Sequence, residues 1–474
     1  TRDAVEFLAQ LFDDAHADEL AGVGLQDFLA GAHAIWRESE TRSGDVQYVA
    51  LREMPAADGG VRARLSLEIV GPDMPFLVDS IMGEINVQGL SALALFHPIV
   101  SCSRDADGTR DPAGAETRES YIWVHLDPLD AGRRHSLLDG VQATLRDVRA
   151  AVADFPAMRA RMQDAIRELQ GASTPASPAE QAESVAFLTW LAEDRFAFLG
   201  AREQSYPRGA HGKIIEGDPV IAPHSGLGLL RDKDRGILRR GKAPTPVTVA
   251  IGEYLDEPHP IIVSKSNLKS RVHRRVYADY IGVKRYDANA QVIGETRFVG
   301  LFTSESYNAL ARDIPLLRRK AARILDRAGK IPGSHSAKAL HNIVETYPRD
   351  ELFQVAEDDL LNTALGVLHL QDMPRTRIFV RRDRFDRYAS ILLFLPRERY
   401  NSDPREKIGA ILAGAYGGRV SSYYPSFNDG PLARVHFIIG GFFPGHPEPD
   451  VAALEDRVVA LARWAPAADR RVVH

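Results

Sequence analysis

The same order of strands and helices is predicted twice in this chain, and few folds have that order. Residues 62–169 read as strand, helix, strand, strand and helix, and a further strand within 47–54 could supply the remaining edge. In "ARLSLEIV" the apolar residues Leu65, Leu67 and Ile69 alternate with polar ones, so all three share one face of a strand. This composition of elements is typical of a ferredoxin-like α+β sandwich.

The second copy lies at the end of the chain. Two strands around the turn "RFDR" precede a helix predicted over 403–418, which has Pro404 in its first turn and glycines at its end. Two more strands and a final helix follow. Residues 373–474 therefore predict a second sandwich with an extra leading strand, which is either truncated at its end or continues further.

Between the two sandwiches the pattern changes to strands. After a helix predicted over 179–193, about five strands follow, with a hairpin turn at "DANAQ". Such a sheet suggests a PAS-like or GAF-like module. Helices return between Pro315 and Leu370. A Ser/Pro/Ala segment at 170–180 is predicted as a domain boundary, after one long helix expected over 136–169.

A corner rich in glycine and proline joins the first strand to the first helix of the leading sandwich. It reads "GPDMPF" from Gly71, and the next helix carries an apolar stripe that stops at Gly89. Asp73 is expected to cap that helix, with Pro75 in its first turn. Because the N–H groups of a helix N-terminus also favour a carboxylate, the corner reads either as a structural turn or as a pocket for a small ligand.

Charge and cysteine content exclude several classes of function. A net charge of −5 disfavours a general polyanion-binding role. One cysteine, Cys102, permits neither an internal disulfide nor a cysteine-based zinc site, and fits a reducing compartment. No apolar run reaches the roughly 18 residues of a membrane span. The acidic N-terminus is unlike a secretory signal. The chain is expected to be cytoplasmic, with neither nucleic acid nor membrane as a partner.

Motifs of catalysis and cofactor binding do not occur. We find no dinucleotide or phosphate-binding glycine loop and no nucleophile elbow. Cys102, on an apolar strand, predicts an inert buried thiol. His341 and Glu345 are one helical turn apart and are interpreted as a packing or surface pair rather than as metal ligands. No catalytic residue, cofactor or metal is therefore assigned within this chain.

Basic residues cluster in "KSNLKSRVHRRVY", residues 265–277. Arg271, Arg274 and Arg275 are candidates for an anion site or a subunit contact, and a solvated face paired with acids elsewhere is the alternative. Because a strand is predicted here, His273 and Arg275 are expected to line one side.

Several words of the sequence resemble, in order, one protein family. "GPDMPFLVDSIMGEIN", "LTWLAEDRFAFLGAREQ", "VHRRVYADYIGVKRYD", "ETYPRDELFQ" and "RIFVRRDRFDRYASILLFLPRERYN" are similar to the N-terminal region of the large bacterial NAD-dependent glutamate dehydrogenases. The resemblance spans about residues 15–445. It implies ACT-like domains, a PAS-like module and helical segments that serve regulation and assembly in a homo-oligomer, a tetramer or hexamer. The catalytic domain, which binds NAD and glutamate, would lie downstream.

The resemblance gives the predicted modules their names. The expected α+β, multidomain layout places N-terminal helices at 1–43, an ACT-like domain at 44–170, a PAS-like domain at 178–305, a helical segment at 306–372 and a second ACT-like domain at 373–474. The implied function is a non-catalytic regulatory and oligomerisation segment, with allosteric regulation of amino-acid catabolism. The parent enzyme would convert L-glutamate and NAD to 2-oxoglutarate, ammonia and NADH.

The resemblance also assigns a candidate site and leaves alternatives open. An amino-acid effector would meet the ACT turn at Pro72, Asp73, Met74, Pro75, Phe76 and Leu77. Phe76 stands where ACT domains often carry glycine, which lets an effector approach the backbone closely, so assembly is favoured over effector binding. A stand-alone sensory protein that binds an amino acid or an anion is one alternative. An enzyme active within this chain is another, and no motif supports it.

Overall fold

The described residues of this computed structural model belong to two compact units. Unit 1 comprises Thr1–Pro156, Leu227–Leu229 and Lys269–Tyr277, and unit 2 comprises the remaining residues up to His474. The structure describes residues 2–13, 25–42, 47–54, 64–207, 209, 219–240, 243–244, 254–400, 402–427, 430–441 and 446–464.

Unit 1 is built on one antiparallel sheet. The strands along its path are β1 (Tyr48–Met54), β2 (Arg64–Pro72), β5 (Ala115–Leu126) and β3 (Ala92–Phe96), and β4 (Ile99–Arg104) also pairs with β5. β2 and β5 lie at the centre, with Leu67 opposite Val124. β1 precedes β2 in the chain and pairs with it at the edge, which confirms the strand predicted within 47–54.

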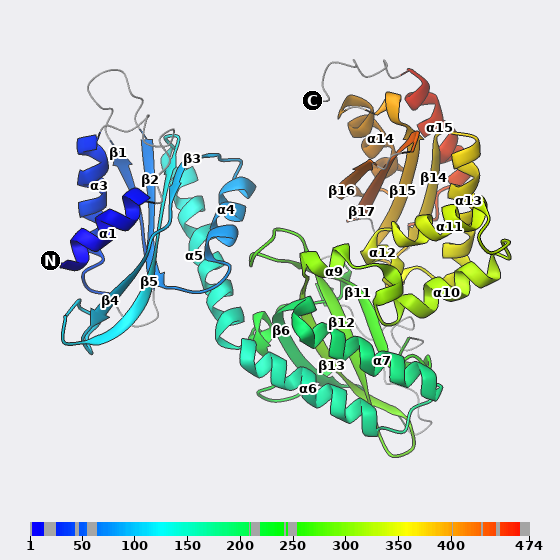
Figure 1. Ribbon diagram of the computed structural model, residues 1–474, viewed down its shortest axis with the longest axis horizontal. Helices are drawn as coiled ribbons and strands as arrows, with labels where there is room; N and C mark the ends of the chain where they lie inside the picture. Colours follow the sequence, from blue (N-terminus) through cyan, green and yellow to red (C-terminus); the bar gives the residue numbers. More distant parts are fainter. Residues whose placement is uncertain are drawn as a thin grey trace. The chain divides into compact units, whose positions relative to one another are not determined.

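Helices cover both faces of this sheet (Figure 1). On one face, α1 (Arg2–Asp13) and α3 (Leu25–Glu38) pack against a cluster that includes Tyr121 and Trp123 of β5. On the other lie α4 (Leu77–Val87) and α5 (Ala131–Ala153). Successive side chains of β2 point to opposite faces of the sheet, so each face packs against its own helices. The predicted α+β sandwich is confirmed.

The helix predicted over 136–169 is two helices, so that prediction was wrong. α5 ends at Ala153, and α6 runs from Phe155 to Gly171. Pro156 has no N–H to donate to the preceding turn, and its ring would clash with the carbonyl there, so one helix cannot pass through it. Asp154 lies at the break, where its carboxylate accepts the N–H of Gly228 at 2.6 Å.

Unit 2 begins with a strand-rich module. Its sheet follows the order β11 (Ile261–Lys269), β12 (Tyr277–Tyr286), β13 (Val292–Phe302), β6 (Phe196–Ser205) and β7 (Val220–Ile221). α6 packs along it through the ion pair of Arg285 with Glu168, at 3.2 Å, while α7 (Pro178–Trp190) places Trp190 6.5 Å from the ring of Phe302. One of the five strands predicted for this module is "PVTVAIGEYL", residues 246–255; residues 246–253 lie outside the described residues, and Tyr254 and Leu255 are helical.

Four helices follow, as predicted between Pro315 and Leu370. They are α10 (Leu317–Arg327), α11 (His335–Glu345), α12 (Arg349–Gln354) and α13 (Glu357–Asp372). Short elements complete the described chain: β8 (Leu227–Gly228), β9 (Arg239–Arg240), β10 (Ala243–Pro244) and α9 (Ser304–Asn308), with single turns at Leu191–Arg195, Leu229–Arg231, Ala311–Asp313 and Arg397–Arg399.

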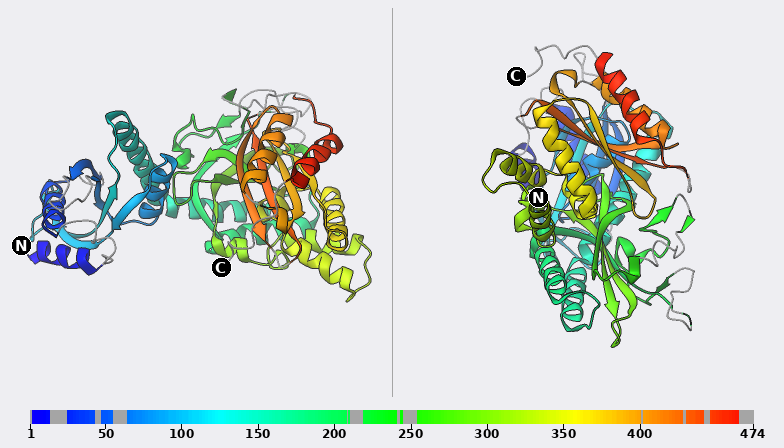
Figure 2. Two further views of the ribbon diagram at one scale, coloured as in Figure 1. Left: turned by 90° about the horizontal axis from the view of Figure 1, so that it is seen from above. Right: turned by 90° about the vertical axis from the view of Figure 1, so that its right-hand side faces the viewer.

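The last sheet repeats the strand order of the first. Its path is β14 (Arg377–Arg382), β15 (Tyr388–Pro396), β17 (Leu432–Gly440) and β16 (Arg419–Phe427). As β1 does in unit 1, the leading strand β14 pairs beside the central strand. α14 (Ser402–Ala415) and α15 (Val451–Trp464) cover one face (Figure 2), and α13 covers the other, where Gly366 leaves room for the ring of Phe379. The predicted second sandwich with its extra strand is confirmed.

Candidate functional site

The corner between β2 and α4 is not capped as predicted. α4 begins at Leu77, two residues after Pro75, and its N-cap position is Phe76, whose side chain makes no capping hydrogen bond. The carboxylate of Asp73 lies 3.4 Å from Arg118 instead. Because the chain turns through Phe76 before the helix starts, Asp73 is too far back to reach the first helical N–H groups. Both the cap by Asp73 and the first-turn position of Pro75 were wrong.

Phe76 itself has a left-handed backbone, with φ 72° and ψ 2°. Glycine adopts such a conformation without steric cost, whereas a residue with a Cβ atom is disfavoured by roughly 1–2 kcal/mol. This explains why a glycine suits the matching position of an ACT turn. The Phe76 ring lies 5.2 Å from the imidazole of His273, so it is covered by another part of unit 1.

The basic segment is a loop, not a strand. β11 ends at Lys269 and β12 begins at Tyr277, and between them His273 has a φ of 63°. The hydroxyl of Ser270 accepts the N–H of Val272 at 3.0 Å, which tightens the turn. The prediction that His273 and Arg275 line one side of a strand was therefore wrong, because strand alternation does not apply to this loop.

The loop joins two sets of residues that were predicted separately. The N–H of His273 donates to Ser80 Oγ at 2.8 Å, and its Nδ1 lies 2.9 Å from a carboxylate oxygen of Asp79, both in α4. Arg275 forms an ion pair with Glu84 of the same helix. Arg275, one of the three candidate arginines, thus reaches an acid of the corner helix, and Arg271 and Arg274 lie half-buried beside it.

Sequence reasoning missed Ser80, Asp79 and Glu84, and it placed His273 on a strand rather than in a loop. A signal for Glu84 was present, because it follows Ile81 by three residues and so lies on the buried face of the helix. A carboxylate at a buried position requires a partner. Nothing in the sequence marks Arg275 as that partner, because the rest of the first sandwich and most of the strand-rich module lie between the two residues in the chain.

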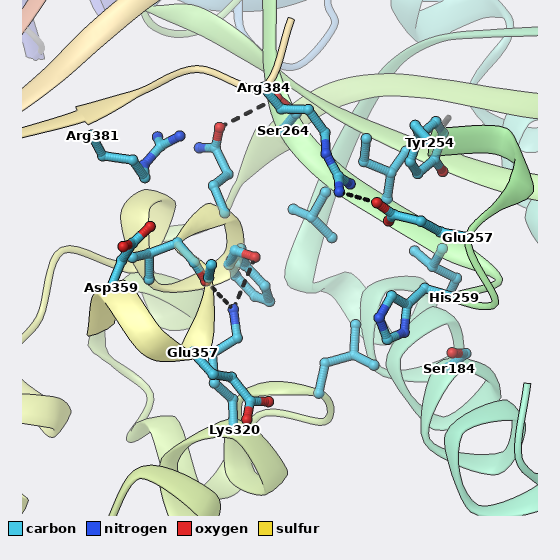
Figure 3. Close-up of a pocket in the computed structure, with 18 of the residues that line it drawn as sticks. Ser184, Tyr254, Glu257, His259, Ser264, Lys320, Glu357, Asp359, Arg381 and Arg384 are labelled. Carbon is cyan, nitrogen blue, oxygen red and sulfur yellow. Dashed lines mark hydrogen bonds and ion pairs between the residues drawn. The ribbon is translucent and has the colours of Figure 1, made fainter. Parts of the chain in front are cut away.

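Unit 2 contains a cleft of about 620 Å³ whose lining carries both signs of charge (Figure 3). Arg384 forms an ion pair with Glu257, and Arg323 donates to Glu357 at 2.7 Å. Most charges of the lining are thus already paired. Arg319 also lines the cleft, and its charge acts on Glu180 and Glu183, whose carboxyl pKa values are lowered chiefly by closer hydrogen bonds.

Two cations at this cleft hold its wall together. Lys320 donates to the backbone carbonyls of Leu352, Phe353 and Val355 at 2.8, 3.2 and 3.0 Å, which satisfies the end of α12. Burial lowers the pKa of Lys320 to about 8. Arg381 of β14 donates twice to Glu351 of α12, at 2.7 Å each. These contacts hold α12 against its neighbours, so we assign them a structural role rather than a catalytic one.

The remaining candidates behave as structural residues. The thiol of Cys102 is buried, as predicted, and burial raises its pKa to about 11, so it is a poor nucleophile at neutral pH. Glu345 accepts the N–H of Ala311 at 2.6 Å and lies 3.9 Å from His341, which is the geometry of a packing pair. Among the described residues no group of three or more His, Cys, Asp or Glu side chains is placed to hold a metal ion. None of the described helices combines the length and apolarity of a membrane span.

Three family models match this chain. They are described as glutamate dehydrogenase ACT1 domain, over residues 7–141, glutamate dehydrogenase helical motif 1, over 314–373, and glutamate dehydrogenase ACT2 domain, over 377–465. The matches coincide with the sandwich of unit 1, the four helices α10 to α13 and the second sandwich.

Curated relatives match nearly the whole chain. The NAD-specific glutamate dehydrogenase of Halomonas elongata is 33% identical over 478 residues, which cover 97% of this chain and 29% of the relative. That of Pseudomonas aeruginosa is 32% identical over 467 residues, 96% of this chain and 28% of the relative. That of Mycobacterium tuberculosis is 26% identical over 435 residues, 90% of this chain and 25% of the relative. The chain spans less than a third of the length of each relative.

Proposed function

Because this chain belongs to the NAD-specific glutamate dehydrogenase family, in which it corresponds to the N-terminal region, we propose that it is the regulatory and assembly segment of such an enzyme. The parent reaction would be the oxidative deamination of L-glutamate to 2-oxoglutarate and ammonia with NAD, in the cytoplasm. In this proposal the chain contributes no catalytic residue and holds no NAD, and the catalytic domain lies outside it.

The observation that carries the proposal is the pair of sandwiches with one strand order. In each, a leading strand covers one edge of the sheet, and a later strand forms the other edge. In the second sandwich that other edge is β16, with Tyr423, Tyr424 and Phe427 exposed by 41%, 46% and 47%. An unpaired strand edge beside exposed aromatic side chains suits contact with another chain. We therefore assign β16 to subunit contact in a homo-oligomer.

The corner of the first sandwich supports assembly over effector binding. A ligand carboxylate at the start of α4 would need open N–H groups and space beside the backbone. Phe76, at the N-cap position of α4, carries a ring there instead of a glycine hydrogen, and that ring packs against His273. The proposed layout is N-terminal helices, an ACT-like domain, a PAS-like domain, a helical segment and a second ACT-like domain.

Two measurements test the proposed function. This chain alone, given L-glutamate and NAD, is expected to form no NADH, and turnover by the chain would overturn the non-catalytic assignment. In the full-length enzyme, Phe76→Ala and Asp73→Ala are expected to leave the response to added amino acids unchanged. A lost response to one amino acid in these variants would instead favour an effector site at the corner.

The cleft of unit 2 favours one alternative, a sensory protein that binds an amino acid or an anion. Its mixed charges, with Arg319 among them, suit a small zwitterion or a carboxylate. A thermal-shift screen of amino acids, nucleotides and carboxylates on this chain tests it, with Arg319→Gln as the matched variant. A ligand that stabilises the chain and fails with Arg319→Gln would support the alternative, and no shift with any ligand would count against it.

A further inference from the structure

Residues 270–276 lie on α4 and α5 in the manner of a bound peptide. Within unit 1 they contact these two helices through side chains and through the backbone N–H of His273. We propose that the first ACT-like domain carries a docking site for a short basic segment, and that this chain's own residues 270–276 occupy it reversibly. The docking contact does not depend on the proposed function. Only a regulatory role for the contact rests on that proposal.

A buried ion pair anchors the segment. The side chains of Arg275 and Glu84 are 15% and 5% exposed. Arg275 also donates to Thr144 Oγ1 of α5 at 3.1 Å, and Glu84 accepts from the same hydroxyl at 3.3 Å and from Gln88 Nε2 at 3.0 Å. Because a buried carboxylate without its cation is strongly unfavourable, the site selects a basic occupant.

A second set of contacts holds the segment at the first turn of α4. Ser80 Oγ accepts the N–H of His273 at 2.8 Å, the imidazole lies 2.9 Å from Asp79, and the ring of Phe76 packs against it. The side chains of His273 and Asp79 are 34% and 60% exposed, so water competes for this half of the site. The segment is therefore anchored at Arg275 and loosely held at His273.

Both helices leave room for the ion pair at a glycine. A Cβ atom at Gly83 of α4 would lie 3.1 Å from Cγ of Arg275, and one at Gly140 of α5 would lie 2.1 Å from Oε1 of Glu84. Glycine inside a helix is less favourable than alanine. Two such glycines beside one ion pair indicate that the helices are shaped around an arginine.

Strain on both sides of the contact favours reversibility. Phe76 of the site and His273 of the segment both have left-handed backbones, at φ 72° and 63°, and their rings face each other. Residues with a Cβ atom hold such conformations only where surrounding contacts enforce them. Undocking relieves His273 directly, and the exposed contacts at Asp79 are readily replaced by water.

The acidic character of the site also decides between two kinds of occupant. Asp73, Asp79 and Glu84 lie at the corner or along α4. Their charges repel the carboxylate of a free amino acid and attract an arginine. The occupant is therefore a basic stretch of polypeptide, and the sequence "SRVHRRV" supplies one.

Native-state hydrogen exchange on the whole chain, followed over a range of denaturant below unfolding, tests the proposal. The amide of His273 is expected to exchange through a local opening that depends less on denaturant than global unfolding does. Arg275→Ala is expected to increase that opening by roughly a hundredfold. Arg271→Ala, in the same loop but without a hydrogen-bond or ion-pair partner in the described part of the chain, is the control and should change it less than about twofold.

A peptide added in trans gives an independent measurement. A labelled peptide of residues 269–277 is expected to bind the Arg275→Ala chain, whose own segment is weakened, far more tightly than the wild-type chain. The same peptide with its arginine at 275 changed to alanine should not bind. If Arg275→Ala does not fold, the pair Ser80→Ala and Asp79→Asn removes only the exposed half of the site and should raise the exchange of His273 with the fold intact. Exchange of His273 only by global unfolding, or absence of peptide binding to a folded variant, would overturn the proposal.

Discussion

Phe76 combines an unfavourable backbone angle with a favourable packing contact, and two substitutions separate these effects. Its φ of 72° is comfortable for glycine and costly for any other residue, while its ring is packed against His273. Phe76→Ala removes the ring and keeps the strain, whereas Phe76→Gly removes both. We expect the glycine variant to be more stable than the alanine variant by about 1 kcal/mol, measured by urea unfolding. Equal stability of the two variants would mean that the corner relaxes away from the left-handed conformation.

His125 is buried among aromatic rings. It is 0% exposed, neither ring nitrogen has a hydrogen-bond partner among the described residues, and its ring contacts Trp123 and Phe96 edge-on. Burial, with a smaller contribution from the charge of Arg64, lowers the pKa of His125 to about 4. Its neighbours are aromatic, so the site suits a hydrocarbon ring better than an imidazole.

The low pKa of His125 gives stability a definite dependence on pH. The unfolded chain binds the proton near pH 6.5 and the folded chain only near pH 4, so acidification between these values favours unfolding. His125→Phe removes that dependence and the unsatisfied nitrogens. We expect it to stabilise the protein at pH 7 by about 1–2 kcal/mol and by more at pH 5, measured by denaturant unfolding at both pH values. A variant less stable at both would show that a bound water satisfies the imidazole.

At the scale of elements, α12 depends on one ion pair with the last sheet. Glu351 is 2% exposed and accepts two hydrogen bonds from Arg381 of β14. Glu351→Ala leaves Arg381 buried and unpaired, so we expect a loss of about 3–5 kcal/mol in the free energy of unfolding. Glu357→Ala breaks the more exposed pair with Arg323 and is the control, with an expected loss below about 1 kcal/mol. Similar losses in both variants, measured by thermal or urea unfolding, would contradict the difference in burial.

The local pattern of apolar and polar residues predicted most helices and strands. The predictions failed where a distant contact or a single residue determines the local structure. The strands of both sandwiches follow from alternation, as at Leu65, Leu67 and Ile69. The break between α5 and α6 is marked in the sequence by Pro156, which the prediction of one helix over 136–169 did not take into account. The loop at His273 was predicted as strand because its partner Ser80 lies 193 positions away in the sequence.

The candidate site was predicted in two halves. The corner was located by its glycine and proline residues, and the arginines by their clustering, so both sets of residues were found from the sequence. Their contact was not, because charge clustering identifies a basic segment without its acid. The αL turn at Phe76 was also missed, since phenylalanine carries no local signal for a positive φ.

At the scale of the whole molecule, β16 gives the proposed assembly a test. Tyr424→Lys places a charge on the exposed strand edge, so we expect the mass of the full-length enzyme in light scattering to fall to that of a smaller oligomer. Ile331→Lys, at a side chain that is 77% exposed in the helical segment, is the control and should leave the mass unchanged. An unchanged mass with Tyr424→Lys would exclude this edge as the subunit contact.

The make-up of unit 1 has a consequence for how the protein is made. Its sandwich is complete in the first 156 residues, yet the arginine that neutralises Glu84 belongs to Lys269–Tyr277. On a ribosome, the ACT-like domain therefore emerges and collapses long before Arg275 is synthesised. Until then Glu84 is held by Thr144 and Gln88 alone, and a protein truncated before residue 269 remains in that incomplete state. The first domain is finished only by a residue translated more than a hundred codons after its last helix.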